Sequence, residues 1–447
     1  MPGLRRLRPC GFVLPLSDPD PDRGVGGGLG AAKAVVEISD LGAEGDGVAE
    51  LDGARVFVPG ALAGEQVAIA APIEGRAALQ AVLRPSPMRR APICPLFADC
   101  GSCAVQHAED VAIAAWKTDL VRIALRRAGI EAAVEPIRAA WGAGRRRLAI
   151  HARRGSGPNG IVFGFAARAS HRFIEVGACP VLTPTLEAKL PALRAIAAFL
   201  MRGQDALTLH ATDTETGIEV DLRGFKKGGF RLAADELTHL SGLARAGGLV
   251  RVTIDGGLAL QIAAPIVRFG RAAVELPPRG FLQATKAAED LLGDLAMEAV
   301  AGAKSVADLF CGAGAFSFRL AERAKVLAVD SAPEAIAALE QAARHVSGLK
   351  PITAIRRDLF RSPLSAKELG AFDAVVFDPP RAGAEAQARQ LASARVAQIA
   401  AISCAPASFA RDAKILIDGG YRLTKVAPVD QFRFAAHVEL AARFERS

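Results

Sequence analysis

The C-terminal part of the chain, from about Arg279, alternates short apolar runs with amphipathic segments. Its runs are KSVADLF, KVLAVD, PITAIRR, FDAVVFD, VAQIAAIS and YRLTKVAPV, and PEAIAALEQAARHV is one of the segments between them. Such runs are typical of strands buried on both faces, and helices supply the crossovers that parallel strands need. The pattern therefore predicts an α/β domain over residues 276–447, with a doubly wound, Rossmann-like parallel sheet.

The rest of the chain needs further domains, because 447 residues are too many for one ordinary domain. Hydrophobic residues make up 51% of the chain, which excludes a wholly disordered protein. No stretch reaches about 18 uncharged apolar residues, so no membrane span is expected. The apolar part of the opening segment MPGLRRLRPCGFVLPLS is too short for a secretory signal. We expect a cytoplasmic protein and a monomer.

Three regions precede the α/β domain. Residues 1–32 are rich in Pro, Gly and Asp without a hydrophobic period, and we expect a disordered leader. Residues 33–88 contain short alternating apolar runs between glycine turns, which predicts a small antiparallel β-barrel. Its surface could bind nucleic acid, or the barrel could be a plain spacer. Residues 89–275 combine a helical stretch at 107–129 with strand-like segments, and predict a central α+β domain.

The central region holds an unusual arginine segment. Between Arg138 and Arg172 there is no Asp or Glu, although the net charge of the whole chain is only +8. Such a window favours binding of phosphate backbones over an incidental charged surface. We expect Arg145, Arg146 and Arg147 to contact RNA, so that neutralising them would flatten the salt dependence of binding. The segment contains eight arginines, at positions 138, 145, 146, 147, 153, 154, 168 and 172.

A nucleotide-type site is predicted where the first strands of the α/β domain end. The segment ADLFCGAGAFSFRLA puts Gly312 and Gly314 in the turn between strand and helix, where a backbone can approach a ligand closely. Asp330 ends the next strand and could accept both ribose hydroxyls. Asp358 could reach an adenine, and Asp378 begins the strand-end segment DPPR. A strand-end D-P-P beyond such a site indicates a methyltransferase that uses S-adenosylmethionine.

A thiol and a carboxylate could carry the chemistry. Cys404 follows the fifth strand and precedes a helix, whose dipole favours a thiolate, and Glu439 lies on a late strand. A thiolate that attacks carbon 6 of a pyrimidine makes carbon 5 nucleophilic, and a base must then remove the carbon-5 proton. Cys404 and Glu439 would supply these roles, and Asp378 could bind the imide edge of the ring. We expect Cys311 to pack against the cofactor.

Together these residues resemble the RNA 5-methyluridine methyltransferase family (TrmA/RumA-like), from about Ala34 to the end of the chain. The family motifs are similar to FLQAT, DLFCGAGAF, FDPPRAG, SCAPASFARD and VDQFRFAAHVE. The resemblance implies that Phe281 and Gln283 meet the target base and the methyl donor, and that Phe310 lies at the cofactor. It also implies Cys404 as nucleophile and Glu439 as proton acceptor.

The cysteines gain a meaning from the same resemblance. The segment ICPLFADCGSC and the distant GACPVL could on physical grounds hold zinc or an iron–sulfur cluster. In the family this pattern ligates a 4Fe-4S cluster, and the barrel at 33–88 looks like its TRAM RNA-binding domain. Both features together point to 23S ribosomal RNA as substrate, with transfer RNA the less favoured partner. The expected ligands are Cys94, Cys100, Cys103 and Cys179, which leaves Cys10 in the leader.

Two other functions stay open from the sequence. An enzyme that methylates an exocyclic amine would need no thiol, although Arg381 stands where the aromatic residue of that class is expected. An RNA-binding factor with a decayed site is the other, because Ala315, Ala405 and Thr285 stand where many family members carry Asn. The favoured expectation is an RNA (uracil-5-)-methyltransferase of EC class 2.1.1.

Overall fold

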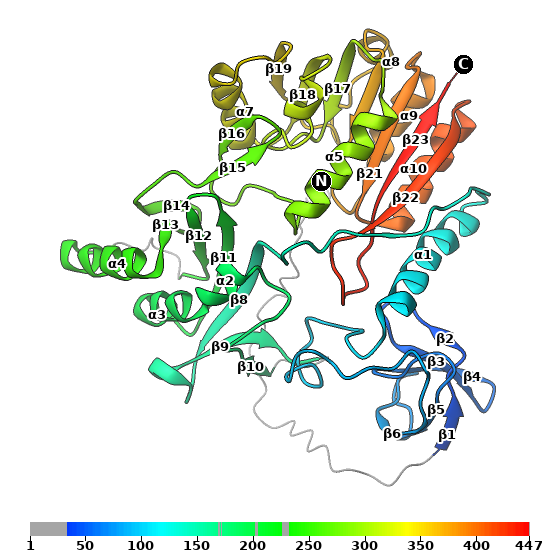
Figure 1. Cartoon of the computed structure of the whole chain (residues 1–447), viewed down its shortest axis with the longest axis vertical. Coiled ribbons are helices and arrows are strands. Elements are labelled where there is room, and N and C mark those ends of the chain that lie inside the picture. Colours follow the sequence, from blue (N-terminus) through cyan, green and yellow to red (C-terminus); the bar gives the residue numbers. More distant parts are fainter. Residues whose placement is uncertain (1–33, 169, 171, 202–203, 226–231, 447) are drawn as a thin grey trace, which may run out of the picture. The chain divides into compact units, whose positions relative to one another are not determined.

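The computed structural model describes residues 34–168, 170, 172–201, 204–225 and 232–446. The chain separates into two compact units (Figure 1). One comprises the described part of Met1–Pro92 with Cys103–Trp116 and Phe434–Ala436, and the other comprises Ile93–Ser102, Lys117–Arg433 and His437–Ser447. The expected leader at 1–32, with Cys10, lies outside the described residues. No helix in the described part of the chain is both long enough and apolar enough to cross a membrane.

The first unit contains two small antiparallel sheets around one core. Val36 and Val67 from one sheet and Val56 and Val58 from the other belong to the same buried cluster, as expected of a small barrel. The indole of Trp116 donates a hydrogen bond to the carbonyl of Gly42 (3.0 Å). One sheet has the order β1-β5-β6 and the other β2-β3-β4. The strands are β1 (Ala34–Glu37), β2 (Asp40–Leu41), β3 (Gly47–Leu51), β4 (Ala54–Val58), β5 (Gln66–Ile69) and β6 (Leu79–Arg84).

The central region forms a seven-stranded sheet with the order β10-β9-β8-β11-β12-β13-β14. One face is apolar, through side chains such as Ile150, Leu209 and Val220, and packs on helices α2 to α4. The strands are β8 (Arg147–Arg154), β9 (Ile161–Ala166), β10 (Phe173–Glu175), β11 (Ala206–Thr214), β12 (Gly217–Arg223), β13 (Leu249–Ile254) and β14 (Gly257–Gln261). The helices are η1 (Pro158–Gly160), α2 (Pro184–Ala188), α3 (Leu190–Leu200) and α4 (Ala234–Gly247).

The C-terminal part forms an eight-stranded sheet with the order β19-β18-β17-β20-β21-β23-β22-β7. The strands β17, β18, β19, β20 and β21 are parallel, so the predicted α/β fold is confirmed. Its strands are β7 (Arg138–Ala139), β17 (Ser305–Leu309), β18 (Lys325–Asp330), β19 (Ile352–Arg356), β20 (Ala374–Phe377), β21 (Gln398–Ser403), β22 (Arg422–Asp430) and β23 (Glu439–Glu445). A hairpin of β15 (Ile266–Phe269) and β16 (Ala272–Glu275) precedes it.

One strand of this sheet departs from the parallel pattern. β23 runs antiparallel to both β21 and β22. The segment between β22 and β23 contains no helix that could carry the chain back across the sheet, so β23 returns beside β22 in the opposite direction. β23 thereby starts at the edge where β21 ends.

Helices cover both faces of the eight-stranded sheet (Figure 1). Ala374 and Val376 of β20 face one buried cluster, and Val375 and Phe377 face the other, as the alternation of a strand requires. Helices α5 (Lys286–Ala299), α6 (Ser317–Leu320) and α7 (Pro333–His345) pack on the first face. Helices α1 (Asp110–Arg127), α8 (Ala366–Leu369), α9 (Glu385–Ser393) and α10 (Pro406–Asp418) contribute to the second.

Candidate active site

The predicted chemical residues follow strand ends on one edge of the eight-stranded sheet. The loop that starts at Phe310 follows β17, Asp378 follows β20, and Cys404 follows β21. These strands are parallel neighbours, so their carboxyl ends meet at the same edge. Open α/β sheets bind ligands at this edge, where the strand order reverses, here between β17 and β20.

The antiparallel strand β23 brings Glu439 to the same place. Its pairing with β21 ends at Ser403 opposite Leu440, so one further step of this register would put Cys404 opposite Glu439. Facing residues on antiparallel strands have Cα atoms about 4.5–5.5 Å apart. Glu439 is buried and Cys404 is half-buried. The sheet therefore brings a thiol and a carboxylate from strands of opposite direction to one edge.

The loop after β17 has the backbone of a ligand-binding turn. Phe310 has φ 62°, a left-handed conformation that a non-glycine residue seldom adopts. Gly312 is also left-handed, and no described heavy atom lies within 4 Å of where its Cβ would stand. The amide of Gly312 donates to Asp330 Oδ2 (2.9 Å), and Asp330 Oδ1 accepts from Ala332 N (2.8 Å). A carboxylate has about four acceptor positions, so Asp330 can order this loop and still accept ribose hydroxyls.

Asp308 is a buried acid in the strand before this loop, and no motif in the sequence predicts it as a site residue. Its Oδ2 accepts a hydrogen bond from the Ser317 hydroxyl, and its Oδ1 has no hydrogen-bond partner among the described residues. Burial, and then the nearby charges of Asp378 and Asp330, raise the pKa of Asp308 to about 7. The same surroundings raise the pKa of the Cys311 thiol well above its ordinary value, so this buried cysteine is not a nucleophile.

Asp358 organises the next loop along the edge. Its Oδ1 accepts from the backbone amides of Phe360 (3.0 Å) and Arg361 (3.3 Å). The turn brings the Phe360 ring to 5.5 Å from the Phe310 ring, between centroids. Phe360 is 38% exposed, which is unusual for a large apolar side chain. The two rings offer an apolar surface of the kind that a planar adenine can contact.

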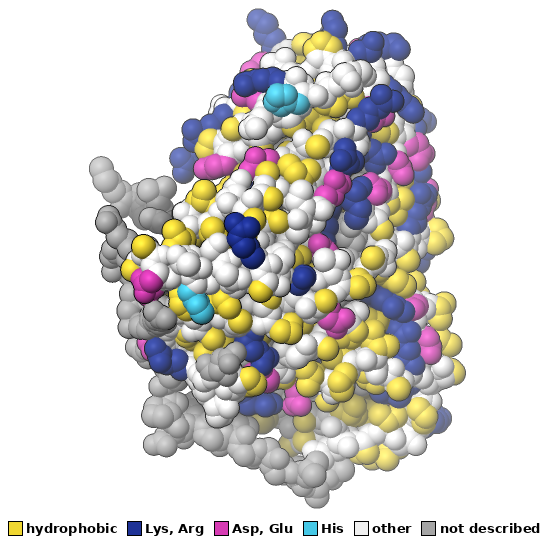
Figure 2. Space-filling model, turned by 60° about the vertical axis from the view of Figure 1, so that its left-hand side comes forward, with side chains coloured by type: hydrophobic (Ala, Val, Ile, Leu, Met, Phe, Trp, Pro, Cys, Tyr) yellow, Lys and Arg dark blue, Asp and Glu magenta, His cyan; other side chains and the backbone are white. Residues whose placement is uncertain are grey.

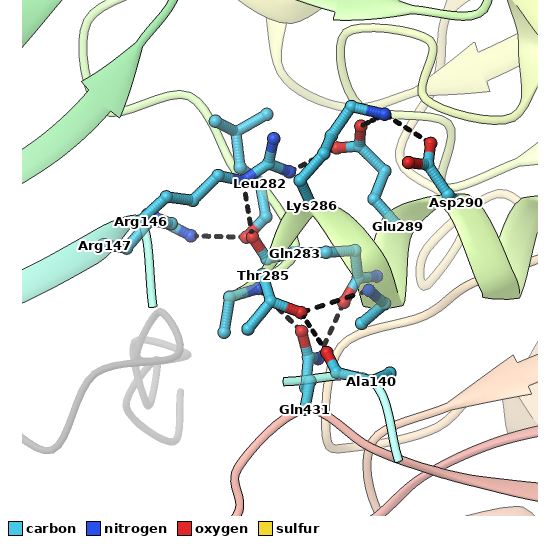
Figure 3. A network of polar contacts seen from close by, with 12 residues as sticks. Ala140, Arg146, Arg147, Leu282, Gln283, Thr285, Lys286, Glu289, Asp290 and Gln431 are labelled. Atoms are coloured by element: carbon cyan, nitrogen blue, oxygen red, sulfur yellow. Dashed lines mark hydrogen bonds and ion pairs between the residues drawn. The ribbon is translucent and has the colours of Figure 1, made fainter. Parts of the chain in front are cut away.

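Gln283 is held in a dense polar network next to the sheet edge (Figure 3). Its Nε2 donates to Asp378 Oδ2 (3.2 Å), and its Oε1 accepts from Gln431 Nε2 (2.8 Å). Gln431 Nε2 also donates to Glu439 Oε1 (2.9 Å). Thr285 caps helix α5 by accepting from Ala288 N (3.1 Å) and donates to the carbonyl of Ala140 (2.6 Å). Thr285 therefore forms hydrogen bonds at a position where many family members are expected to carry Asn.

Two of the three arginines expected to bind RNA contact the segment that carries Gln283. Arg146 is buried, ion-paired to Glu289, and donates through Nε to the carbonyl of Gln283 (3.1 Å). Arg147 donates to the carbonyl of Leu282 (3.0 Å), and the Arg145 guanidinium lies 5.2 Å from the centre of the Phe432 ring. The burial of Arg146 argues against a direct phosphate contact by this side chain.

The other arginines of the segment also have partners in the protein. Arg138 pairs with Glu135 (2.8 Å) and Arg172 with Asp99 (3.2 Å). Like Glu289, these acids lie outside the window 138–172, which explains why the window looked uncompensated. Basic side chains are interspersed with acidic and hydrophobic ones on the face in Figure 2. The remaining contacts are those of Arg153 with the Phe173 ring, Arg154 with the Gln204 carbonyl and Arg168 with the Phe97 ring.

Positive charge does gather beside the loop between β22 and β23. The pKa of His437 is lowered to about 4, first by partial desolvation and then by the charges of Arg381, Arg145 and Lys117. His437 is exposed, so a ligand can reach it and the cations beside it. His437 is neutral near pH 7, and the cations next to it favour an anionic ligand.

The cysteines proposed as cluster ligands are not assembled into a metal site. Among the described residues, no group of three or more His, Cys, Asp or Glu side chains is arranged to hold a metal ion. Cys94, Cys100, Cys103 and Cys179 form no disulfides. Leu96 packs against the buried cluster of Cys100 and also against the one that contacts Cys179. Reduced thiols beside apolar side chains suit iron–sulfur ligation chemically.

Comparisons with known proteins identify the family of this chain. Residues 276–447 match the family model described as tRNA (Uracil-5-)-methyltransferase. An uncharacterized RNA methyltransferase of Caulobacter vibrioides is 43% identical, over 92% of this chain and 99% of the relative. The 23S rRNA (uracil(1939)-C(5))-methyltransferase of Edwardsiella ictaluri is 31% identical, over 92% of this chain and 95% of the relative.

A solved structure shares the fold over almost the whole chain. It is the tRNA (uracil-54, C5)-methyltransferase of Pyrococcus abyssi in complex with S-adenosyl-L-homocysteine, with a TM-score of 0.69 and 20% identity. The likeness covers 92% of this chain and 99% of the other. The chain belongs to the RNA (uracil-5-)-methyltransferase family, whose enzymes take their methyl group from S-adenosylmethionine.

Proposed function

We propose that this protein methylates carbon 5 of a uridine in 23S ribosomal RNA, with Cys404 as the nucleophile and Glu439 as the base. The observation that carries the proposal is the β21–β23 register, which, extended by one residue, would put Cys404 opposite Glu439 at the edge that also bears the donor loop. An enzyme that methylates amines would have no use for this pair. Thr285, with two hydrogen bonds, speaks against a decayed site.

The cofactor residues proposed from the sequence fit S-adenosylmethionine. The open space at Gly312 lets a ligand approach the backbone, and Asp330 is held beside it as an acceptor. Phe310 would contact the cofactor, Asp358 would shape the adenine end, and Gly314 would turn the chain into the helix. When bound, S-adenosylmethionine supplies an electrophilic methyl group. Gln283 would contact the methyl donor and the target base, and Asp378 would bind the imide edge of the base.

The chain's own residues would carry the other steps. The Cys404 thiolate forms a bond to carbon 6, and the electrons of the carbon 5–carbon 6 double bond move into an enolate that Asp378 can orient through the imide edge. Carbon 5 would then form a bond to the methyl group, whose bond to the sulfonium sulfur of the donor breaks and leaves a neutral thioether. Glu439 removes the carbon-5 proton, the electrons of that C–H bond restore the double bond, and the C6–S bond breaks to return the thiolate. Phe281, which is 57% exposed beside Arg147, would contact the target base.

The choice of 23S ribosomal RNA rests on the relatives and on the N-terminal unit. The Edwardsiella ictaluri relative is named for this substrate and matches nearly end to end. The barrel at 33–88 would serve as a TRAM RNA-binding domain and residues 89–275 as a central RNA-binding domain, ahead of the methyltransferase domain at 276–447. Arg145 and Arg147 would still contribute to RNA binding. Transfer RNA is the other substrate to test, because the Pyrococcus abyssi enzyme acts on it.

A 4Fe-4S cluster held by Cys94, Cys100, Cys103 and Cys179 is part of the proposal. Its support is the C-x5-C-x2-C spacing and the apolar surroundings of Cys100 and Cys179. No step of methyl transfer needs it, so its role would be to stabilise the RNA-binding region.

Two variants test the covalent mechanism. Cys404→Ala should reduce methyl transfer to background and form no covalent RNA adduct, because no thiolate can attack carbon 6. Glu439→Gln should form the adduct but release it slowly, because no base removes the carbon-5 proton. The measurements are transfer of labelled methyl groups to ribosomal RNA and a denaturing gel that detects the adduct.

Nucleoside analysis provides the control for substrate and product. Ribosomal RNA from cells that lack the protein should gain 5-methyluridine on treatment with the wild-type enzyme, whereas transfer RNA should gain little. Methylated adenine or cytosine without 5-methyluridine would contradict the proposal. Full activity of Cys404→Ala would do the same.

A further inference from the structure

A chain of buried hydrogen bonds joins two carboxylates across the candidate active site. Asp378 Oδ2 accepts from Gln283 Nε2 (3.2 Å), Gln283 Oε1 accepts from Gln431 Nε2 (2.8 Å), and Gln431 Nε2 also donates to Glu439 Oε1 (2.9 Å). Gln283, Gln431 and Glu439 are each at most 4% exposed. Water therefore competes little for these contacts, and each one has more weight than it would at the surface.

One backbone amide sets the direction of the whole chain. The N–H of Ala284 donates to Gln431 Oε1 (2.7 Å), and a backbone N–H can only donate. The amide nitrogen of Gln431 must therefore face Gln283 and Glu439. The oxygen of Gln283 then faces Gln431, and its nitrogen faces Asp378. In this orientation both carboxylates accept a hydrogen bond from a side-chain N–H.

Gln431 is itself held in a rigid turn at the end of β22. The preceding residue, Asp430, accepts from the Lys117 ammonium (2.6 Å) and from the amide of Phe432 (3.0 Å). Lys117 is fully buried and also donates to the carbonyl of Phe432 (2.8 Å). A buried cation thus fixes the backbone on both sides of Gln431, so its amide stays where Glu439 needs it.

We propose that Gln431 is a positioning residue for proton abstraction, which holds the Glu439 carboxylate at the carbon-5 proton and ties it to Gln283. This inference rests on the proposed function. In the step concerned, the proton passes from carbon 5 to Glu439, the C–H electrons form the carbon 5–carbon 6 double bond, and the C6–S bond breaks to leave the Cys404 thiolate. Gln431 exchanges no proton; its amide holds the carboxylate in one orientation through the step.

The test compares two substitutions of Gln431 with a matched glutamine elsewhere. Gln431→Met keeps the length of the side chain and removes donor and acceptor, whereas Gln431→Glu keeps the acceptor for Ala284 and removes the donor to Glu439. Gln387 is equally buried, exchanges two hydrogen bonds with the backbone of Leu364 and lies in helix α9, so Gln387→Leu controls for the loss of a buried amide.

Both Gln431 variants should lower kcat about 10- to 100-fold, because a misplaced base loses much of its effect. The KM for S-adenosylmethionine should stay within about twofold, and covalent RNA adduct should accumulate on a denaturing gel, since elimination is the slowed step. Gln387→Leu should leave kcat and adduct level unchanged, even if its melting temperature falls.

Two results would overturn the role of Gln431. One is a kcat for both variants equal to that of Gln387→Leu. The other is a raised KM with unchanged kcat, which would assign the amide to donor binding through Gln283. Cys404→Ala and Glu439→Gln are assayed in parallel. If Cys404→Ala and Glu439→Gln behave as expected but the Gln431 variants match wild type, only the role of Gln431 is contradicted. If Cys404→Ala is active, the proposed function itself is contradicted.

Discussion

Asp308 shows how one side chain can make the stability of this protein depend on pH. Its pKa is about 7 in the folded chain, against an ordinary value of 3.8, mainly because it is buried. Between about pH 4 and pH 7 the folded state therefore holds a proton that the unfolded state has lost. As the pH rises through this window, the contribution of Asp308 to the free energy of unfolding falls. Above pH 7 the full cost of burying its charge is present.

Asp308→Asn should remove this dependence, because Asn is neutral and can still accept from Ser317. At pH 8 the variant should be more stable than wild type by on the order of 2–4 kcal/mol, and the difference should shrink toward pH 4. Urea unfolding at several pH values measures it. If the free energies of unfolding of the two proteins changed with pH in the same way, Asp308 would be ionised in the folded state over the whole range. That result would contradict the prediction.

Polar side chains that belong to no recognisable motif are the hardest to give a role from the sequence. Asp308 stands among apolar residues in SVADLF, and Gln431 follows Asp430 at the end of the apolar run in VAPVDQF. A polar residue in or next to a buried run is a signal that something must satisfy it. It does not name the partner, which for Gln431 lies 148 residues away at Gln283.

Strand β8 is an element that the sequence pattern did not predict. Its inward residues Leu148, Ile150 and Ala152 alternate as a strand requires, but arginines surround them and hide the alternation. Cross-strand contacts with β9 and β11 provide the order that the local pattern does not show. The arginines just before and at the start of this strand then reach the segment that carries Gln283.

Arg146 should therefore matter for stability more than for RNA affinity. Arg146→Ala leaves Glu289 buried without its closest cation, and losing one partner of a buried pair costs about 3–5 kcal/mol. Burial already raises the pKa of Glu289, and the charge of Arg146 opposes this effect. Without Arg146 the charged form of Glu289 would be disfavoured further. The free energy of unfolding, from urea titration, should fall accordingly.

The double variant Arg146→Met, Glu289→Met is the control, since it removes both charges and should recover most of the lost stability. The opposite result would support the hypothesis that Arg146 contacts RNA. Arg146→Ala would then unfold like wild type, while its RNA affinity would drop and depend less steeply on salt.

The cluster is a question for the whole molecule, because its proposed ligands come from distant parts of the chain. Protein purified without oxygen should be brown and contain about four iron and four sulfide per chain, and Cys179→Ser should lower that content. Loss of the cluster should lower the melting temperature of the protein. A colourless protein that contains zinc instead of iron would contradict the proposal.

The sequence by itself determined the alternation of strands and helices in the C-terminal α/β domain, the donor loop after β17, and the strand ends that carry Asp378 and Cys404. These features are local: apolar runs, amphipathic segments and glycine turns act over a few residues. Only the tertiary structure decided that β23 runs antiparallel and begins opposite the end of β21, and that Arg146 pairs with Glu289 rather than facing solvent. These contacts join residues far apart in the chain, and those of Arg146 with Glu289 and of Gln431 with Gln283 span more than a hundred positions. Only the packing of the sheets brings such partners together.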